Sequence, residues 1–415
     1  MRRLAGNVAI GQMGGPTPVV NASLVGVLQR LERHGFRGRA YMPVGGVKGF
    51  VDGRFNVMAE PLSRLPVDAE KLKRTPGSDA FSSRMKADEE KCIIILERCR
   101  QLDIHYLFLI GGNDTAETAQ SIDAATKAAG YELFVFHIPK TIDCDLRNND
   151  HTPGYPSAAT AAANFVARLN YESRSMSAIE IVVLMGRESS YLSLATAFAK
   201  NGDPAKAPHL IYPCEVLFDA DRFIEDLRAA YARAGGGIVV VVSEGIRVPN
   251  GQGTVLFFEK LAEEFGLPVE RDSYGNIRID DLMLATGLGR LVRSRLGRTG
   301  LRLSVDVPNY LLRCAEATEL DVQEAYRAGT EAVDIVIQQQ RPSGSVTLQR
   351  RSSRPYALSL EIADLTSMAG AASRAPPEFI NTDGNYPSEA FMEWARPLMG
   401  PVFRGTELPR TIVTL

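Results

Sequence analysis

One short segment in the first half of the chain combines residue types that can accept a proton, hold a metal ion and bind an anion. Residues 138–145 read IPKTIDCD, so that Asp143 and Asp145 lie two positions apart and Lys140 precedes them. Such a loop offers a proton acceptor, a metal ligand and a cation within a few residues. A polar cluster at residues 148–154 follows at once, which favours a functional site over two solvated turn residues.

Two glycine pairs provide a second kind of signal. The pair at 14–15 precedes a predicted helix from about Asn21, and the pair at 111–112 is followed by Asn-Asp-Thr. Paired glycines let backbone amides approach a phosphate, and the following helix adds unpaired N–H groups. The amide, carboxylate and hydroxyl after the second pair are typical of a site shared by phosphate and a divalent cation. Neither a GxxxxGK[ST] loop nor a GxGxxG motif after a strand occurs, which disfavours P-loop kinases and dinucleotide dehydrogenases.

The elements that must position these residues follow one repeated pattern. Short runs rich in β-branched and aromatic residues end at a glycine or proline and are followed by helical stretches. Continuous apolar runs of this kind indicate buried parallel strands in βαβ units. The runs are 7–10, 40–44, 106–110 and 133–138 in the first half, and 179–184 and 238–242 in the second half.

The pattern predicts an α/β protein with two doubly wound Rossmann-like lobes, mainly parallel sheets and a cleft between them. We expect residues 1–154, joined by about 315–350, to form the N-terminal lobe. Residues 155–314, joined by about 351–415, are expected to form the C-terminal lobe. In such sheets ligands bind where strands end and helices begin.

Two further segments carry local predictions. Residues 321 to about 340 are predicted to form an amphipathic helix, because their apolar residues can share one face. Residues 349–354 are basic and polar, and we expect a surface connection there.

Composition indicates an ordinary globular enzyme. The chain has 415 residues, of which 45% are hydrophobic and 23% charged, and a formal net charge of -2. This charge gives no reason to expect nucleic acid or a membrane as a partner. The five cysteines form no CxxC pair, and no run of about 20 apolar residues occurs, so we expect a cytoplasmic protein.

Six motifs in order resemble the phosphofructokinase family: GGPTPVVN, GGNDT, IPKTIDCD, DHTPGY, LMGR and VVSEG, from about residue 6 to about residue 340. Lys140 and Asp114 are similar to the branch that uses pyrophosphate, because ATP-using members have glycine at both positions. A carboxylate at Asp114 would repel a nucleotide, whereas the ammonium of Lys140 can neutralise pyrophosphate.

This resemblance implies reversible, Mg²⁺-dependent transfer of a phosphoryl group from pyrophosphate to the 1-position of fructose 6-phosphate, by a homodimer or homotetramer. Asp143 would be the general base, Lys140 would stabilise the transferring group, and Thr141 would contact it. Asp114 and Asp145 would be the metal ligands. The expected donor-binding residues are Gly14, Gly15, Arg84, Gly112, Asn113, Asp114 and Thr115.

A sugar phosphate needs guanidinium groups for its phosphate and acceptors for its hydroxyls. By the resemblance, Arg187 and Glu244 contact fructose 6-phosphate, and a basic pair beside a tyrosine binds the 6-phosphate. The expected sugar-binding residues are Met185, Gly186, Arg187, Glu244, Arg302, Tyr310 and Arg313.

The sequence also departs from the family pattern. Asn113 stands where many relatives carry a metal-binding aspartate, and Cys144 replaces the usual asparagine. The altered segments 189–191 and 309–312 leave the sugar acceptor open. The alternatives are sedoheptulose 7-phosphate as acceptor, ATP as donor, and a catalytically silent regulatory subunit. Retention of Lys140, Asp143 and Asp145 argues against a silent subunit.

Overall fold

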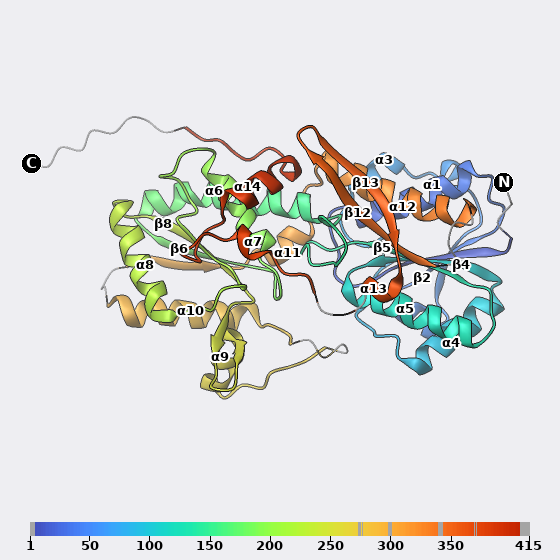
Figure 1. The fold of residues 1–415 in the computed structure, drawn as a ribbon, viewed down its shortest axis with the longest axis horizontal. Coiled ribbons are helices and arrows are strands. Elements are labelled where there is room, and N and C mark those ends of the chain that lie inside the picture. Colours follow the sequence, from blue (N-terminus) through green and yellow to red (C-terminus); the bar gives the residue numbers. More distant parts are fainter. Residues whose placement is uncertain are drawn as a thin grey trace, which may run out of the picture.

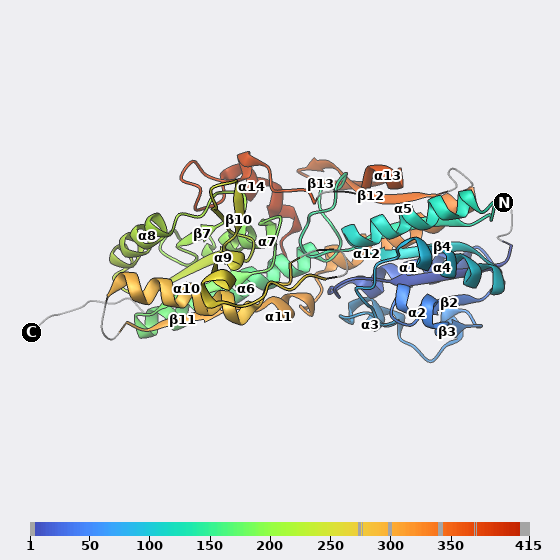
Figure 2. The same cartoon turned by 90° about the horizontal axis from the view of Figure 1, so that it is seen from below.

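The protein consists of two α/β lobes that lie side by side along its long axis (Figures 1 and 2). The computed structural model describes residues 5–272, 275, 277–297, 301–338, 343–368, 370 and 372–406. The described strands of the first lobe form a seven-stranded sheet in the order β13-β12-β5-β4-β1-β2-β3. Only the edge pairs β12–β13 and β2–β3 are antiparallel. The strands are β1 (Asn7–Gln12), β2 (Ala40–Pro43), β3 (Phe55–Met58), β4 (Ile104–Gly111), β5 (Phe134–Pro139), β12 (Gly344–Ser353) and β13 (Tyr356–Ala363).

Helices cover both faces of this sheet. On one face α1 (Val20–Arg33) packs with α12 (Glu319–Gln338), and α3 (Ala69–Arg74) lies against α1. Close approach of α1 and α12 requires glycine, because a Cβ at Gly329 would lie 2.2 Å from the carbonyl oxygen of Ser23. The other face is covered by α2 (Val47–Asp52), α4 (Glu89–Gln101) and α5 (Asn113–Ala128).

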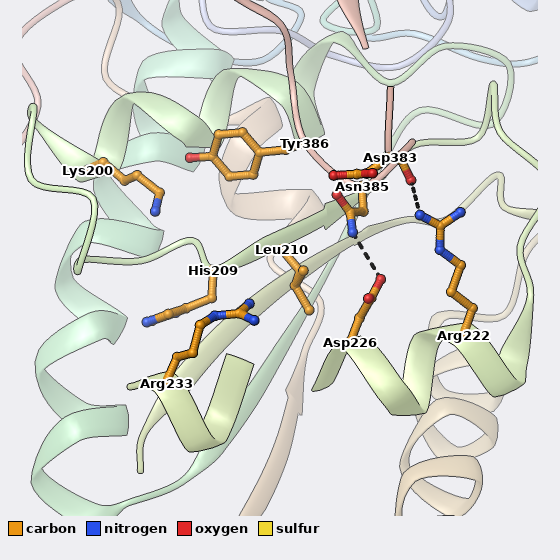
Figure 3. Close-up of a pocket in the computed structure, with 9 residues that line it drawn as sticks. All are labelled: Lys200, His209, Leu210, Arg222, Asp226, Arg233, Asp383, Asn385 and Tyr386. Atoms are coloured by element: carbon orange, nitrogen blue, oxygen red, sulfur yellow. Dashed lines mark hydrogen bonds between the residues drawn. The ribbon is translucent and has the colours of Figure 1, made fainter. Parts of the chain in front are cut away.

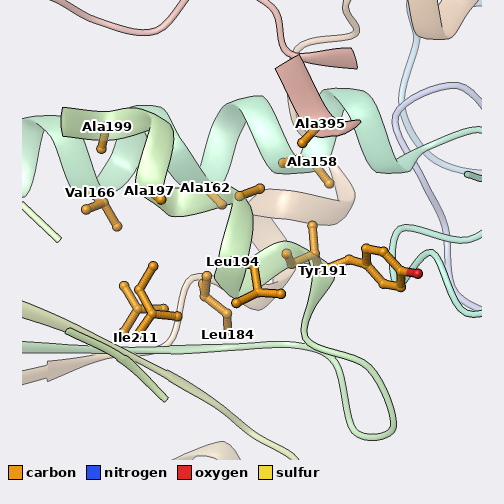
Figure 4. Close-up of a cluster of buried hydrophobic side chains, with 14 of the residues drawn as sticks. Ala158, Ala162, Val166, Leu184, Tyr191, Leu194, Ala197, Ala199, Ile211 and Ala395 are labelled. Carbon is orange, nitrogen blue, oxygen red and sulfur yellow. The ribbon is translucent and has the colours of Figure 1, made fainter. Parts of the chain in front are cut away.

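The second lobe contains a parallel four-stranded sheet in the order β11-β6-β8-β7. Small residues of α6, four positions apart, pack against Leu184 and Ile211 (Figure 4). The opposite face is covered by α8, α9 and α10. The strands are β6 (Ile179–Leu184), β7 (Leu210–Tyr212), β8 (Ile238–Ser243) and β11 (Leu303–Asp306), and β9 (Arg247–Pro249) pairs with β10 (Thr254–Leu256). The helices of this lobe are α6 (Tyr155–Met176), α7 (Tyr191–Ala195), α8 (Ala220–Arg233), α9 (Phe257–Phe265), α10 (Asp281–Leu296), α11 (Asn309–Arg313) and α14 (Glu389–Ala395), whereas α13 (Leu365–Met368) lies against α5 of the first lobe.

The predicted fold class is confirmed, but the end of the chain differs from expectation. Residues 349–353 belong to β12 rather than to a surface connection, and β13 extends the first sheet instead of joining the second lobe. The outer half of β12 is polar because it pairs with β13 at the sheet edge, where one face meets solvent. After α13 the chain crosses to the second lobe, where α14 packs (Figure 1).

Residues 339–342 and 407–415, which fall within the two joined segments, lie outside the described residues. Within the part of the chain that is described, no helix has the length and apolar character needed to span a membrane.

Candidate active site

A cavity of about 480 Å³ lies where strands of both lobes end. Its walls come from the segments after β1, β4 and β5 in the first lobe and after β6 in the second, together with a C-terminal strap, which we define as residues 372–376. The predicted residues that line it are Gly14, Gly15, Arg84, Gly112, Asn113, Asp114, Thr115, Lys140, Thr141, Asp143, Asp145, Met185, Arg187 and Arg313. The structure therefore brings most of the predicted site residues together.

Lys140 is the buried cation of this cavity. It directly follows β5, its backbone N–H donates to the Gly111 carbonyl, and its Nζ donates to the Gly15 carbonyl at 2.5 Å. Gly14 has a φ of +75°, so the turn favours glycine at this position. Burial, followed by the nearby charge of Arg313, lowers the pKa of Lys140 to about 7, and the charge of Asp143 opposes this shift. The side chain is only 3% exposed, so its charge acts in a low dielectric.

Asp143 has one carboxylate oxygen that is available to accept a hydrogen bond. Its Oδ1 is buried and has no hydrogen-bond partner among the described residues. Burial raises the pKa of Asp143, whereas Arg313, Arg187 and Lys140 oppose that rise. The Asp143 carbonyl accepts a hydrogen bond from the Ser189 hydroxyl at 2.7 Å, which ties this loop to the second lobe. The group can therefore accept a proton from a molecule in the cavity.

Asp145 and its neighbours form the oxygen-rich side of the cavity. Asn113 donates from Nδ2 to Asp145 at 2.7 Å, while its own Oδ1 is buried without a partner in the described chain. Burial, followed by the charge of Asp143, raises the pKa of Asp145 to about 7. Burial, followed by Asp272, also raises the pKa of Asp114.

These oxygens fit a hard cation such as Mg²⁺. No group of three or more His, Cys, Asp or Glu side chains positioned to hold a metal occurs among the described residues. Magnesium commonly uses one or two carboxylates and completes its octahedron with water and substrate phosphates. The carboxylate of Asp145 and the unpartnered amide oxygen of Asn113 fit that requirement.

The segment after β6 approaches the cavity from the second lobe. Arg187 lines the cavity and donates to the Ile277 carbonyl at 2.8 Å. Glu244, at the end of β8, accepts from the Gly186 N–H at 3.3 Å. Burial, followed by Asp143, raises the pKa of Glu244 to about 7. These groups can bind hydroxyl and phosphate groups of a sugar.

Arg313 lines the cavity, whereas Tyr310 and Arg302 do not. The Arg313 guanidinium lies 5.6 Å from the ring centre of Tyr310, but Tyr310 itself is 72% exposed. Arg302 precedes β11 and pairs with Glu172 at 3.4 Å. Because β11 and β6 are parallel, Arg302 lies at the edge of the sheet opposite the cavity, a strand length of about 20 Å away. Within this chain it does not reach the site expected from the sequence.

Several cavity residues were missed by the sequence reasoning. Asp272, Glu188 and Arg374 line the cavity, and Arg374 pairs with Glu188 at 3.1 Å. Buried Asn309 accepts from the Met185 N–H at 2.7 Å. Asp272 and Arg374 follow no strand and belong to no motif, so no local signal identified them. Asn309 and Glu188 stood beside recognised motifs, and that proximity was the available clue.

A second cavity, of about 490 Å³, lies in the C-terminal lobe (Figure 3). Several of its polar groups already have partners: Arg222 donates to the Asp383 carbonyl at 2.6 Å, and Asn385 to Asp226 at 2.9 Å. Lys200 donates to the Pro204 carbonyl at 2.7 Å. This second cavity lacks the glycine pairs and the cluster of open carboxylates that line the cavity between the lobes. The cavity between the lobes is therefore the better candidate for an active site.

Comparisons with known proteins agree with this geometry. The pyrophosphate–fructose 6-phosphate 1-phosphotransferase of Rhodospirillum rubrum is 36% identical over 401 residues, covering 95% of this chain and 94% of its own. Pyrophosphate-dependent phosphofructokinases of Marinobacter aquaeolei (TM-score 0.79, 27% identity, 98% of this chain and 95% of the other) and Nitrosospira multiformis (0.80, 25%, 99% and 99%) have similar structures. The family model described as phosphofructokinase matches residues 7–336. The chain belongs to the phosphofructokinase family.

Proposed function

We propose that this chain transfers a phosphoryl group reversibly from inorganic pyrophosphate to the 1-hydroxyl of fructose 6-phosphate, in the presence of Mg²⁺. The observation that carries the proposal is the buried ammonium of Lys140, which shares one cavity with Asp114 and the open carboxylate of Asp143. The names of the similar proteins support the same donor and acceptor. Both sides of the reaction are phosphate esters or anhydrides, so the transfer can run in either direction.

The donor preference follows from size and charge. Lys140 and the glycine turn at Gly14 and Gly15 form a small cationic cradle suited to a diphosphate. Asp114 places a carboxylate beside it, which would repel the larger polyanionic nucleotide. Arg84 lines the same cavity and adds a permanent cation for the transferring group.

In the forward reaction Asp143 takes the proton of the sugar 1-hydroxyl, and that oxygen attacks the terminal phosphorus of the donor. The new P–O ester bond forms as the anhydride bond breaks, and inorganic phosphate leaves. Lys140 and Arg84 neutralise the charge of the transferring group, because such reactions depend on positioning and charge more than on covalent catalysis. Bound Mg²⁺, held by Asp145 with Asn113 and Asp114 nearby, would neutralise donor oxygens.

The acceptor is held from the second lobe. Met185 lines the cavity, and Glu244 accepts from the N–H of the next residue, Gly186, which supports a role for these groups in binding sugar hydroxyls. Arg313, which also lines the cavity, supplies a guanidinium for the sugar phosphate. Tyr310 is adjacent to Arg313. Thr141 lines the same cavity, and its hydroxyl would contact the moving phosphoryl group.

We also propose that the protein acts in the cytoplasm as a homodimer or homotetramer. All five cysteines are free thiols, which fits a reducing compartment. The exposed side chains of Tyr310 and Leu311 on α11 would be covered by a second copy. Light scattering of the purified chain distinguishes a monomer, which would contradict this assembly, from the two oligomers.

A donor panel tests the function. Purified protein is assayed with fructose 6-phosphate and either pyrophosphate or ATP, with Mg²⁺ and with a chelator, and Asp143→Asn serves as the inactive control. We expect turnover of fructose 6-phosphate only when pyrophosphate and Mg²⁺ are both present, and none with ATP or with the chelator. Equal turnover with ATP would overturn the donor assignment, and turnover with sedoheptulose 7-phosphate but not fructose 6-phosphate would overturn the acceptor.

A further inference from the structure

Behind the active-site loop, which we define as residues 140–154, one largely buried carboxylate joins three parts of the chain. Asp150 accepts hydrogen bonds from His151 at 2.8 Å, from the Arg350 guanidinium at 2.9 Å and from the Trp394 indole at 3.0 Å. The other ring nitrogen of His151 contacts Glu324 at 2.7 Å, and the Tyr356 hydroxyl donates to Glu324 at 2.6 Å. We call this network the Asp150 hub; its members are Asp150, His151, Glu324, Arg350, Tyr356 and Trp394.

The hub is a closed set of charges. His151 is 1% exposed, and each of its ring nitrogens faces a carboxylate, so both nitrogens must carry hydrogen and the imidazole is charged. The hydrogen bonds to Asp150 and Glu324 raise the pKa of His151 to about 9, although burial opposes them. With Arg350 the hub contains two cations and two carboxylates, so that its charges balance. Removing one cation from such a set leaves a buried carboxylate uncompensated.

The hub fixes the second half of the active-site loop, residues 150–153. The Asp150 N–H donates to the Leu348 carbonyl at 2.8 Å. Two residues further on, the Thr152 hydroxyl donates to the Thr141 carbonyl at 2.7 Å, and the Thr141 N–H donates to the Pro153 carbonyl at 3.2 Å. The backbone of Thr141, between Lys140 and Asp143, is therefore held on both sides by residues that the hub anchors.

The hub also reaches the second lobe. The Trp394 ring lies 5.2 Å from the ring of Tyr191, which begins α7 four residues after Arg187. Arg350 lies over the Trp394 ring at 5.4 Å and donates to the Trp394 carbonyl at 2.7 Å. Arg350, Tyr356 and Trp394 all follow residue 336, where the match to the family ends.

We propose that the Asp150 hub is a positioning device, through which the C-terminal segment sets the placement of Lys140, Thr141 and Asp143 for the transfer step. This inference rests on the proposed function for its kinetic consequence, but not for its structural one. None of the hub residues lines the cavity between the lobes, so they are positioning residues. Misplacing reacting groups by about 1 Å can cost about a hundredfold in rate.

Two neighbouring arginines of β12 give a matched test. Arg350 has a 9% exposed side chain in the hub, whereas Arg351 is 59% exposed and pairs with Glu361 at the surface. Arg350→Lys keeps the charge but cannot make the same set of bonds to Asp150 and Trp394, and Arg351→Lys is the control. Trp394→Phe, which removes the N–H to Asp150 and part of the ring but keeps an aromatic side chain there, covers the case in which Arg350→Lys does not fold.

For Arg350→Lys and Trp394→Phe we expect kcat to fall by about tenfold to a hundredfold, with KM for both substrates within about threefold of the parent. Amide hydrogen exchange in residues 141–154 should become about tenfold faster, while Arg351→Lys leaves both measures unchanged. Parent-like kcat and exchange in Trp394→Phe would overturn the proposal, as would a uniform rise in exchange across both lobes. If the unmodified protein shows no turnover, the proposed function fails, and the exchange measurement alone still decides the hub.

Discussion

The charge of Lys140 gives a prediction that can be worked out quantitatively. Its pKa of about 7 lies below the ordinary lysine value of 10.5, so the charged form predominates below pH 7 and is lost as the pH rises. At pH 8.5 only about one molecule in thirty keeps the charge. If the ammonium binds pyrophosphate, the ratio of kcat/KM between the protein and an uncharged variant must fall as the pH rises from 7 to 8.5.

Lys140→Met keeps the length of the side chain and removes its charge. A charge-assisted hydrogen bond contributes about 2–3 kcal/mol, so at pH 6 the variant should lose about 30-fold to 150-fold in kcat/KM for pyrophosphate. By pH 8.5 the ratio of parent to variant should fall by about 15-fold to 25-fold, because the neutral lysine has no advantage over methionine. Because kcat/KM reports the pKa values of free enzyme and free substrate, the charge that the donor brings when bound does not obscure the effect.

The assay measures kcat/KM for pyrophosphate from pH 6 to 9 in both proteins. Protonation of pyrophosphate, and the titration of Asp145 and Glu244 at about 7, affect both alike and cancel in the ratio. Lys200→Met, which changes a lysine of the second cavity, should give a ratio near one throughout. A ratio that stays constant from pH 6 to 9 for Lys140→Met would refute the reasoning.

Three other changes have definite expected outcomes. Asp143→Ala should abolish turnover while calorimetry shows sugar binding within about threefold, and equal loss of both would contradict its role as base. Asp114→Gly combined with Lys140→Gly should raise the ratio of ATP to pyrophosphate turnover, and an unchanged ratio would count against the donor argument. Gly329→Ala should lower the free energy of unfolding by about 1–3 kcal/mol in denaturant titration, because its Cβ meets the Ser23 carbonyl. Gly289→Ala is its control, since the nearest atom to that Cβ is 3.8 Å away, and destabilisation by both would remove the close-approach explanation.

Much of the site could be predicted from the sequence because parallel strands place their carboxyl ends at one edge. Gly15, Gly112 and Lys140 follow three different strands, and the structure places all three on one cavity. Each lay directly after an apolar run with a clear break. The motif at Arg187 joined them because the second lobe presents its own strand ends to the same space.

The remaining features depend on contacts that a local pattern does not contain. Arg374 reaches the cavity because the C-terminal strap is held there, with the Ser373 N–H donating to the Asp145 carbonyl at 2.7 Å. The hairpin of β12 and β13 was missed because the polar half of β12 becomes a strand only through pairing with β13. Arg302 was misplaced because its neighbours in sequence resembled a motif, while the direction of β11 places it at the opposite edge.

The same long-range contacts decide the charge states on which the chemistry depends. Lys140 and Asp145 both titrate near pH 7, but for opposite reasons: burial removes a proton from the lysine and adds one to the aspartate. Arg187 and Arg313, which belong to the other lobe, oppose the rise in the pKa of Asp143. A substrate that brings several negative charges would hold Lys140 protonated, and a metal ion would hold Asp145 ionised. Under the proposed mechanism, the donor and the metal would each favour the working charge state, which would couple donor binding to metal binding.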